Sequence, residues 1–276
     1  MVSIKSKEEI VILRQGGKIL GRILRAVADK AKIGVSTAEL EEIACALIEK
    51  SGGRPAFKNY EIHNGRYFPT ALCTSINEEI VHGPAVPGRI LKNGDLLSID
   101  IGMEWPVRKA EQKKIGISNS HSSDGGFYTD TALSVPIGKI SAKNAKLLRV
   151  TKKSLEIGIA EARPGNTLNN LGRAIQRYVE KNGFSVVRDL VGHGVGYQVH
   201  ESAPEVFNYE FTKYGIPDTI LKPGMVIAIE PMITAGSYHI KSGRGGYAMV
   251  TADGSMAAHF EHTVAIKEKG NIVITE

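Results

Sequence analysis

The feature that most constrains the fold of this chain is a segment that occurs twice. Leu91–Asp100 reappears in similar form as Leu221–Glu230, 130 residues further along. Each copy is a glycine-containing turn followed by an apolar run that ends in a carboxylate, which is the pattern of a buried strand. A second pair of similar segments, Tyr128–Thr131 and Phe260–Thr263, follows in the same order. A duplicated unit with two acids from each half in matching places predicts a metal site between the halves.

The helices are predicted to be duplicated as well. Ser6–Glu9 and Ser36–Glu39 each place a serine three residues before a glutamate, the signature of a capping box, and apolar residues at helical spacing follow both. Ser51–Gly53 is a typical helix stop. A shift of 131 residues aligns Glu49–Gly52 with Glu180–Gly183, so the second half is expected to repeat both helices.

We therefore predict two helix-helix-strand-strand units, about 1–137 and 138–276, that pack as a single domain. The tripeptides centred on His82 and His193 also match, at a shorter spacing. The polar, basic segment of about 103–127 is predicted to be a long exposed hairpin. Six strands are expected, at Thr70–Ile76, Leu96–Gly102, Thr129–Pro136, Ser185–Leu190, Val226–Met232 and His259–Lys267.

Composition indicates an ordinary globular protein. The chain has 276 residues, of which 42% are hydrophobic and 23% charged, and it lacks the apolar run of ~18 residues that a membrane helix needs. Its N-terminus has no signal-peptide pattern. The two cysteines, Cys45 and Cys73, form no C-x-x-C pair, so we expect a reducing, cytoplasmic location. The net charge of +6 predicts a mild affinity for polyanions.

Five residues at or near strand ends form a candidate metal-ligand set: Asp100, Asp130, His193, Glu230 and Glu261. Four carboxylates with one imidazole suit Mn, Fe, Co or Zn rather than a thiolate-bound structural zinc. Taken singly, each acid has an ordinary explanation as a turn residue, a helix cap or half of a surface ion pair. Acids that end apolar strands are poorly placed for solvent, however, and two cations would relieve their mutual repulsion.

The remaining histidines fall into three groups. His63, His121 and His239 have polar neighbours in the sequence and are expected at the surface. His262 follows Glu261, so strand alternation should point it away from the metal-ligand set. His82 and His200 lie outside that set, where one would steady a substrate amide and the other would stabilise a tetrahedral intermediate.

These motifs together resemble the type I methionine aminopeptidases. The resemblance runs from about Ser3 to the C-terminus, and it rests on the metal-ligand set, on the segments around His82 and His193, and on three short motifs: His200-Glu201, Ile229-Glu230-Pro231-Met232 and Glu261-His262-Thr263. It implies an α/β (α+β) pita-bread fold, that of creatinase and the aminopeptidases. It also implies removal of the initiator methionine from nascent polypeptides when the second residue is small.

The resemblance further implies a role for each site residue. Asp100 would chelate one divalent ion, Asp130 and Glu261 would bridge two, and His193 and Glu230 would complete the second site. Glu230 would take a proton from a metal-bridging water, which attacks as hydroxide, and His82 and His200 would contact the substrate. The methionine pocket would be lined by Tyr60, Cys73 and Tyr247, with Phe57 and either Tyr67 or Phe68. Family members of this type are usually monomers.

Several positions depart from the family pattern. Val199 and Tyr247 stand where bacterial members commonly carry phenylalanine and tryptophan, and His259 replaces a usual glutamine. These three residues are expected to reshape the substrate pocket. The 103–127 segment is longer than usual; its lysines either contact ribosomal RNA transiently or form a solvated loop.

Two other classes of protein would share part of this sequence pattern. A prolidase or Xaa-Pro aminopeptidase would share the fold and metal ligands, but those enzymes usually carry a large extra N-terminal domain. A metal-free pita-bread binding protein would lack one or more of the ligands. All five ligand positions and both additional histidines are present here, so the type I aminopeptidase is preferred.

Overall fold

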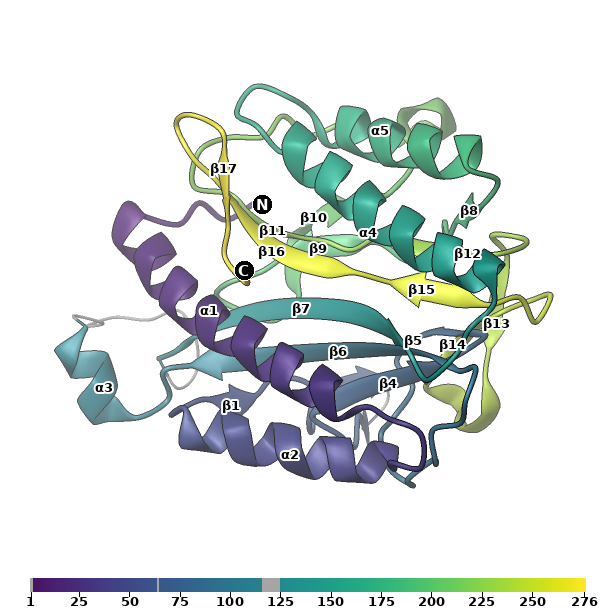
Figure 1. Ribbon diagram of the computed structural model, residues 1–276. Coiled ribbons are helices and arrows are strands. Elements are labelled where there is room, and N and C mark those ends of the chain that lie inside the picture. The colour runs from purple at the N-terminus through teal and green to yellow at the C-terminus, as the bar shows by residue number, and fades with distance from the viewer. Residues whose placement is uncertain (1, 64, 116–124) are drawn as a thin grey trace.

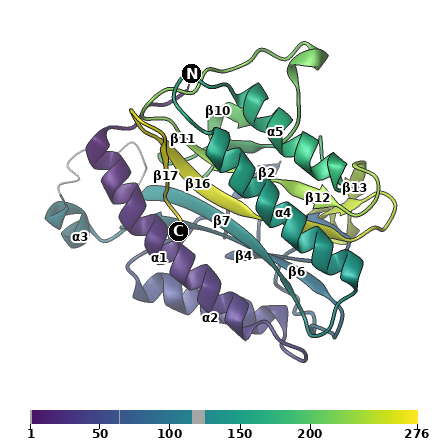
Figure 2. The ribbon, with the colours of Figure 1, turned by 45° about the horizontal axis from the view of Figure 1, so that its top comes forward.

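The computed structural model describes residues 2–63, 65–115 and 125–276, in which helices cover one face of a curled sheet (Figures 1 and 2). The helices are α1 Lys7–Lys30, α2 Thr37–Lys50, α3 Lys109–Lys114, α4 Ala142–Glu161 and α5 Leu168–Lys181. The strands are β1 Arg54–Pro55, β2 Glu61–His63, β3 Arg66–Tyr67, β4 Leu72–Ile76, β5 Glu79–Val81, β6 Leu96–Trp105, β7 Phe127–Pro136, β8 Ser185–Val186, β9 Gly192–Gly194, β10 Glu201–Val206, β11 Val226–Ile229, β12 Met232–Thr234, β13 Ile240–Ser242, β14 Met249–Thr251, β15 Ala257–His259, β16 Glu261–Ile266 and β17 Asn271–Val273.

Both predicted capping boxes are present. Ser6 accepts a hydrogen bond from the Glu9 amide, and the Glu9 carboxylate accepts one from the Ser6 amide, at 3.2 and 2.7 Å. Ser36 and Glu39 begin α2 in the same way. These bonds satisfy backbone N–H groups that have no partner within the helix. The predicted repeat is also confirmed, because α4 and α5 follow in the second half.

The two halves share one nine-stranded sheet, with strand order β1-β6-β7-β16-β11-β9-β10 and with β4 and β17 paired at its sides. The antiparallel pair β6–β7 of the first half corresponds to the pair β11–β16 of the second. The halves join where β7 lies beside β16 (Figure 1), with Glu261 opposite Ala132. The duplicated acids therefore meet near the centre of the sheet.

Strand alternation decides which way these acids point. Leu97, Ile99 and Ile101 of β6 belong to the same buried cluster as the apolar residues of α1 and α2. Because successive side chains of a strand point to opposite faces, Asp100 must point away from the helices. Ile229 of β11 likewise packs in the cluster that contains α4 and α5. The acids therefore gather on the helix-free face.

The structure corrects one match between the halves. β4 pairs with β6 and β9 pairs with β11, so β9 is the counterpart of β4. His193 lies within β9, whereas His82 follows β5. The segment after β5 is bonded to β4 through Gly83, as β10 is bonded to β9. His82 therefore corresponds to His200, and its sequence match with His193 was misleading.

Three predicted strands are shorter or broken. The strand predicted at 226–232 ends at Ile229, and the chain then enters a second, three-stranded sheet as β12. The strand predicted at 259–267 is divided at Phe260 in the same manner, between β15 and β16. Only two residues of the strand predicted at 185–190 are paired. The chain switches sheets at these points, which local hydrophobicity does not reveal.

The 103–127 segment is not simply an exposed hairpin. β6 and β7 stay paired as far as Trp105 and Phe127, and α3 follows β6. Gln112 of α3 is buried and donates a hydrogen bond to the Pro106 carbonyl at 3.0 Å. The Trp105 indole donates to the Ser51 carbonyl at 3.0 Å. Residues 116–124, which include His121, lie outside the described residues.

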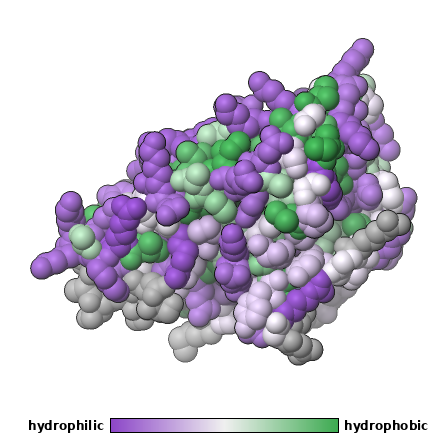
Figure 3. Space-filling view, turned by 90° about the horizontal axis from the view of Figure 1, so that it is seen from below, coloured by the Kyte–Doolittle hydropathy of each residue, from purple (hydrophilic) through white to green (hydrophobic). Residues whose placement is uncertain are grey.

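The surface is of mixed polarity. On the face shown in Figure 3, hydrophilic residues predominate and hydrophobic ones form separate patches. No helix among the described residues is long and apolar enough to cross a membrane.

Candidate active site

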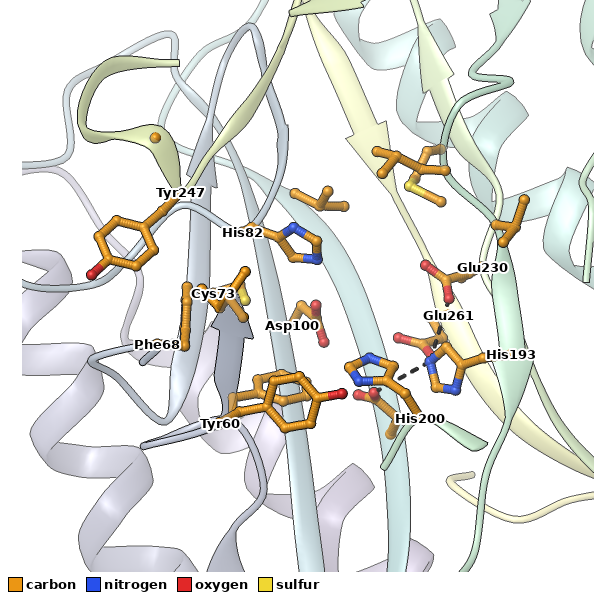
Figure 4. Close-up of a pocket in the computed structure, with 18 residues that line it drawn as sticks. Tyr60, Phe68, Cys73, His82, Asp100, His193, His200, Glu230, Tyr247 and Glu261 are labelled. Atoms are coloured by element: carbon orange, nitrogen blue, oxygen red, sulfur yellow. Dashed lines mark ion pairs between the residues drawn. The ribbon is translucent and has the colours of Figure 1, made fainter. Parts of the chain in front are cut away.

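A cavity of about 230 Å³ opens on the helix-free face, between the two halves. Figure 4 shows Tyr247, Phe68 and Cys73 on one side of it, Glu230, Glu261 and His193 on the other, and Asp100 between them. The lining includes most of the predicted site residues: Phe57, Tyr60, Phe68, Cys73, His82, Asp100, Asp130, His193, His200, Glu230, Tyr247 and Glu261. Phe68, and not Tyr67, is the residue that faces the cavity.

The five residues of the candidate metal-ligand set lie close together in this cavity. The His193 Nε2 atom lies 3.6 Å from Glu230 Oε1 and 3.8 Å from Asp130 Oδ2. Asp100, Asp130 and Glu261 form one group whose ligand atoms lie within 4.8 Å of one another, and His193, Glu230 and Glu261 form another. These two groups share Glu261, an arrangement suited to a carboxylate between two cations. A third group, formed by Asp130, His193 and His200, shares one residue with each of them.

The chemistry of these acids fits a bound metal. Asp100 Oδ1, Asp130 Oδ1 and Glu261 Oε1 are buried and have no hydrogen-bond partner among the described residues. Burial raises the pKa of Asp100 to about 7, and burial together with the neighbouring carboxylates raises the pKa of the other three acids well above the ordinary range. Buried, mutually repelling carboxylates with free oxygen atoms are a natural site for divalent cations.

Backbone contacts across the sheet fix the acids. The Asp130 amide donates to the Thr263 hydroxyl at 3.0 Å, and that hydroxyl donates to the Asp130 carbonyl at 2.8 Å. The Thr131 hydroxyl donates to the Glu261 carbonyl at 2.8 Å. These bonds connect the halves and hold Asp130 beside Glu261, so the spacing of the two acids is set before any ligand binds.

Three histidines line the same cavity. His193 and His200 meet edge to face, with ring centroids 4.4 Å apart. Burial lowers the pKa of His193 to about 4 and that of His200 to about 3, and it also lowers the pKa of His82. All three are therefore neutral near pH 7. His193 Nδ1 lies 3.0 Å from the Gly194 carbonyl, so Nδ1 carries the proton and the Nε2 lone pair faces the acids.

His262 and His239, among the described residues, do not line the cavity. His262 faces the opposite side of the sheet, where Nδ1 lies 2.9 Å from the Thr275 hydroxyl, as alternation predicts. His239 is exposed.

An apolar wall closes the side of the cavity away from the acids. Phe57, Phe68 and Cys73 belong to one buried cluster, and the Phe68 and Tyr247 rings meet edge to face at 5.9 Å. The Arg66 guanidinium stacks 3.8 Å from the centre of the Tyr247 ring. The Tyr247 hydroxyl donates to the Tyr67 carbonyl at 3.3 Å. Tyr247, which belongs to the second half, is thus held in place by residues of the first half.

Two expected pocket residues lie elsewhere. Val199 is buried in the cluster of Phe57 and Phe68 and does not reach the cavity surface. His259 is also buried and lies behind Glu230 rather than in the lining. The motifs that contain Val199 and His259 correctly predicted that both residues lie near the site. They did not reveal that both side chains lie behind the cavity lining.

Further lining residues were not predicted: Ile62, Val81, Leu190, Val191, Met232 and Gly246. Three of them adjoin predicted motifs, since Val81 and Val191 lie one or two residues before a site histidine and Met232 two after Glu230. Ile62 and Gly246 lie two residues after Tyr60 and one before Tyr247, next to predicted pocket residues rather than within a motif.

Similarity to known proteins supports the interpretation of this cavity as a metallopeptidase active site. The model of metallopeptidase family M24 matches residues 11–108 and 117–268. Methionine aminopeptidase 1 of Bacillus subtilis is 43% identical over 278 residues, covering 100% of this chain and 99% of that protein. Methionine aminopeptidase of Clostridium perfringens is 42% identical, with 100% and 99% covered.

Solved structures agree. Methionine aminopeptidase of Thermotoga maritima superimposes with a TM-score of 0.86, at 34% identity and with 100% of both chains covered. The prolidase of Pyrococcus horikoshii is 20% identical, with a TM-score of 0.72 over 99% of this chain and 63% of that one, and shows a shared fold. The curled sheet with its helices on one face is thus the pita-bread fold, and the chain belongs to metallopeptidase family M24, among its type I methionine aminopeptidases.

Proposed function

We propose that this chain is a metal-dependent aminopeptidase that removes the N-terminal methionine of nascent polypeptides when the second residue is small. The observation that carries the proposal is the convergence of four buried acids and His193 beside an apolar cavity. Relatives that are 42–43% identical over the whole chain are methionine aminopeptidases, which supports the same reaction here.

Two divalent ions would be held by the metal-ligand set. Asp100 would bind one ion, His193 and Glu230 the other, and Asp130 and Glu261 would bridge them; the shared Glu261 supports this division. When bound, such ions acidify a water molecule and polarise the peptide carbonyl. Mn, Fe, Co and Zn all suit these donors, so cellular supply would decide the ion.

The protein groups would divide the proton transfers and substrate contacts. Glu230 would accept the proton that the attacking water loses, because its carboxylate lines the cavity and lies 3.6 Å from His193 Nε2 within the metal-ligand set. His200 and His82, both neutral, would donate hydrogen bonds to the substrate: one to the amide, the other to the oxygen on which charge develops. The Tyr60 ring, 5.1 Å from His200, would border the substrate backbone.

The apolar wall would select methionine. Phe57, Phe68 and Tyr247 offer aromatic surface, and the Cys73 thiol lies among them with its pKa raised by burial and by Asp100, so it stays protonated. A thioether makes favourable contacts with aromatic rings and fills an irregular apolar space. A charged side chain would lose its hydration there without a partner.

The reaction would take place in the cytoplasm, where nascent chains emerge, and by a monomer. Both cysteines are free, which agrees with a reducing compartment. Lys113 and Lys114 of α3 are exposed and would contact ribosomal RNA transiently. Charge reversal of both lysines should weaken co-sedimentation with ribosomes at low salt, and unchanged co-sedimentation would refute this contact.

The role of His200 provides the test of the mechanism. His200→Ala should retain the metal content and lower kcat by about 10²–10³-fold, the usual effect of losing one transition-state hydrogen bond. His239→Ala, at an exposed histidine, is the matched control and should behave as wild type. A wild-type kcat in His200→Ala would contradict the assignment.

A further inference from the structure

A lysine from the N-terminal segment is buried beside the active-site loop. Lys5 is 2% exposed, and its Nζ donates to both carboxylate oxygens of Glu201, at 2.6 and 2.7 Å. The Ser3 hydroxyl contacts both members of this pair. The Lys5 amide donates to the Gly224 carbonyl at 2.8 Å, which anchors the segment on the second half of the fold. A buried charge of this kind is tolerated only with such a partner.

The Lys5–Glu201 pair also holds the loop that joins β9 to β10. Glu201 accepts a hydrogen bond from the Tyr197 amide at 3.0 Å, and the Lys5 ammonium lies 4.9 Å from the centre of the Tyr197 ring. The Tyr197 hydroxyl donates to Glu9 at 2.9 Å. Tyr197 is thus fastened to Lys5 and Glu9 near the N-terminus and to Glu201 at the end of the loop.

The packing leaves little room for another arrangement of the loop. Gly196 has a φ of +135°, which L side chains rarely adopt, and a Cβ atom there would lie 2.7 Å from the Lys5 Cε. The Gly196 carbonyl accepts the Tyr128 amide at 2.8 Å. The loop backbone therefore lies directly against the lysine stem, with a glycine at the point of closest approach.

The loop connects two histidines of the site. His193 lies at its start in β9 and His200 at its end, next to Glu201. Glu201 is paired with Gly194 across the two strands. The position of the His200 ring, 4.4 Å from His193, therefore depends on where Glu201 is held.

We propose that Lys5 is a positioning residue: through Glu201 it fixes the loop that places His200 in the cavity. The inference rests on the proposed role of His200 as a substrate-contacting group. The N-terminal segment, although it does not line the cavity, thus contributes to turnover and not only to folding. Misplacement of a catalytic contact by about 1 Å can cost up to ~10²-fold in rate.

A double-mutant cycle in kcat tests this proposal. Lys5→Met keeps the aliphatic stem and removes the charge, and it should lower kcat about 10- to 100-fold while KM and metal content stay near wild type. In the His200→Ala background the same substitution should change kcat less than about twofold, because the group that it positions is already gone. Lys7→Met, at an exposed lysine two residues away, should leave kcat unchanged.

Two further variants distinguish the loss of positioning from a loss of folding. Lys5→Met leaves Glu201 buried and unpaired, so Lys5→Met/Glu201→Gln removes both charges and should fold while keeping the low kcat. Leu171→Ala creates a cavity in the hydrophobic core of the second half, away from the active site. Its kcat at the assay temperature shows the effect of destabilisation alone.

The possible outcomes distinguish the positioning role of Lys5 from the substrate-contacting role of His200. A wild-type kcat in the Lys5 variants, a loss no larger than that in Leu171→Ala, or an equal loss in the His200→Ala background would overturn the positioning role. A wild-type kcat in His200→Ala alone would instead overturn the role assigned to His200 itself.

Discussion

The Nε2 atom of His259 lies 3.7 Å from Oε2 of Glu230, and neither ring nitrogen of His259 has a hydrogen-bond partner within the described part of the chain. His259 is 1% exposed, and its backbone is held on both sides by the Ser134 hydroxyl. A buried imidazole needs a partner, and the Glu230 carboxylate is the acid next to it. His259 is thus placed to orient Glu230 from behind.

Substitution of His259 tests this relationship through metal affinity. His259→Leu should weaken binding of Mn²⁺ about 10- to 100-fold, the usual cost of removing a group that orients a metal ligand from behind. His259→Gln, which still offers an N–H donor, should stay within a few-fold of wild type. Competition with a chelator measures both affinities, with His239→Leu as control. Wild-type affinity in His259→Leu would show that Glu230 needs no support from this side.

Removal of the shared acid should lower metal content itself. Glu261→Ala deletes a residue common to two of the three donor groups, so the purified variant should retain fewer than two tightly bound ions after dialysis. Elemental analysis provides the count. Glu268→Ala removes an exposed acid just after the same strand and should retain the wild-type content. Two tight ions in Glu261→Ala would refute the bridging role.

The raised pKa values predict how stability depends on pH in the metal-free protein. Because the folded acids hold protons more tightly than the unfolded chain does, their contribution to the free energy of unfolding should fall as pH rises, whereas the buried neutral histidines contribute in the opposite direction below about pH 6.5. For Asp100 the window runs from its ordinary pKa of 3.8 to about 7. Calorimetry of the metal-free protein should therefore give a Tm that falls relative to that of Asp100→Asn between about pH 5 and pH 7, because the histidine contributions are common to both proteins. Added Mn²⁺ should stabilise the wild type with release of protons. A difference in Tm between the two proteins that does not change across this range would contradict the raised pKa of Asp100.

The stack of Arg66 on Tyr247 should affect substrate binding more than chemistry. An exposed cation–π contact is worth about 0.5–1 kcal/mol, so Arg66→Ala should raise KM for a methionyl peptide about two- to fivefold with kcat unchanged. Lys58→Ala, an exposed cation nearby in the sequence, is the control. Steady-state kinetics decides the matter: an unchanged KM would mean that Tyr247 holds its place without Arg66.

Local signals in the sequence were strong enough to predict the four long helices, α1, α2, α4 and α5, and to select the residues of the candidate metal-ligand set, but they gave no indication of α3. The capping boxes at Ser6 and Ser36 depend on four consecutive residues, so nothing distant can alter them. Asp100 and Glu230 follow apolar runs that form buried strands, so their carboxylates are largely buried too and need polar or ionic partners. The duplication also indicated that the halves pair, which the β7–β16 contact confirms.

Features that depend on the path of the chain between sheets could not be predicted. The resemblance between the His82 and His193 tripeptides suggested counterparts, but strand pairing matches β9 with β4. Strand β10 has an irregular polar pattern and a proline, Pro204, so periodicity gave no signal for it. Val199 and His259 have the right neighbours in sequence, yet their side chains lie behind the lining, because only packing decides which side of a wall a residue occupies.

The central claim is the reaction itself, and a peptide panel tests it most directly. Metal-reconstituted protein is incubated with Met-Ala-Ser, Met-Leu-Ser, Leu-Ala-Ser and Ala-Pro-Ser, with and without chelator, and the products are identified by mass spectrometry. The account predicts chelator-sensitive release of methionine from Met-Ala-Ser alone. Cleavage of Ala-Pro-Ser instead, or no cleavage with any of Mn, Fe, Co or Zn, would contradict it.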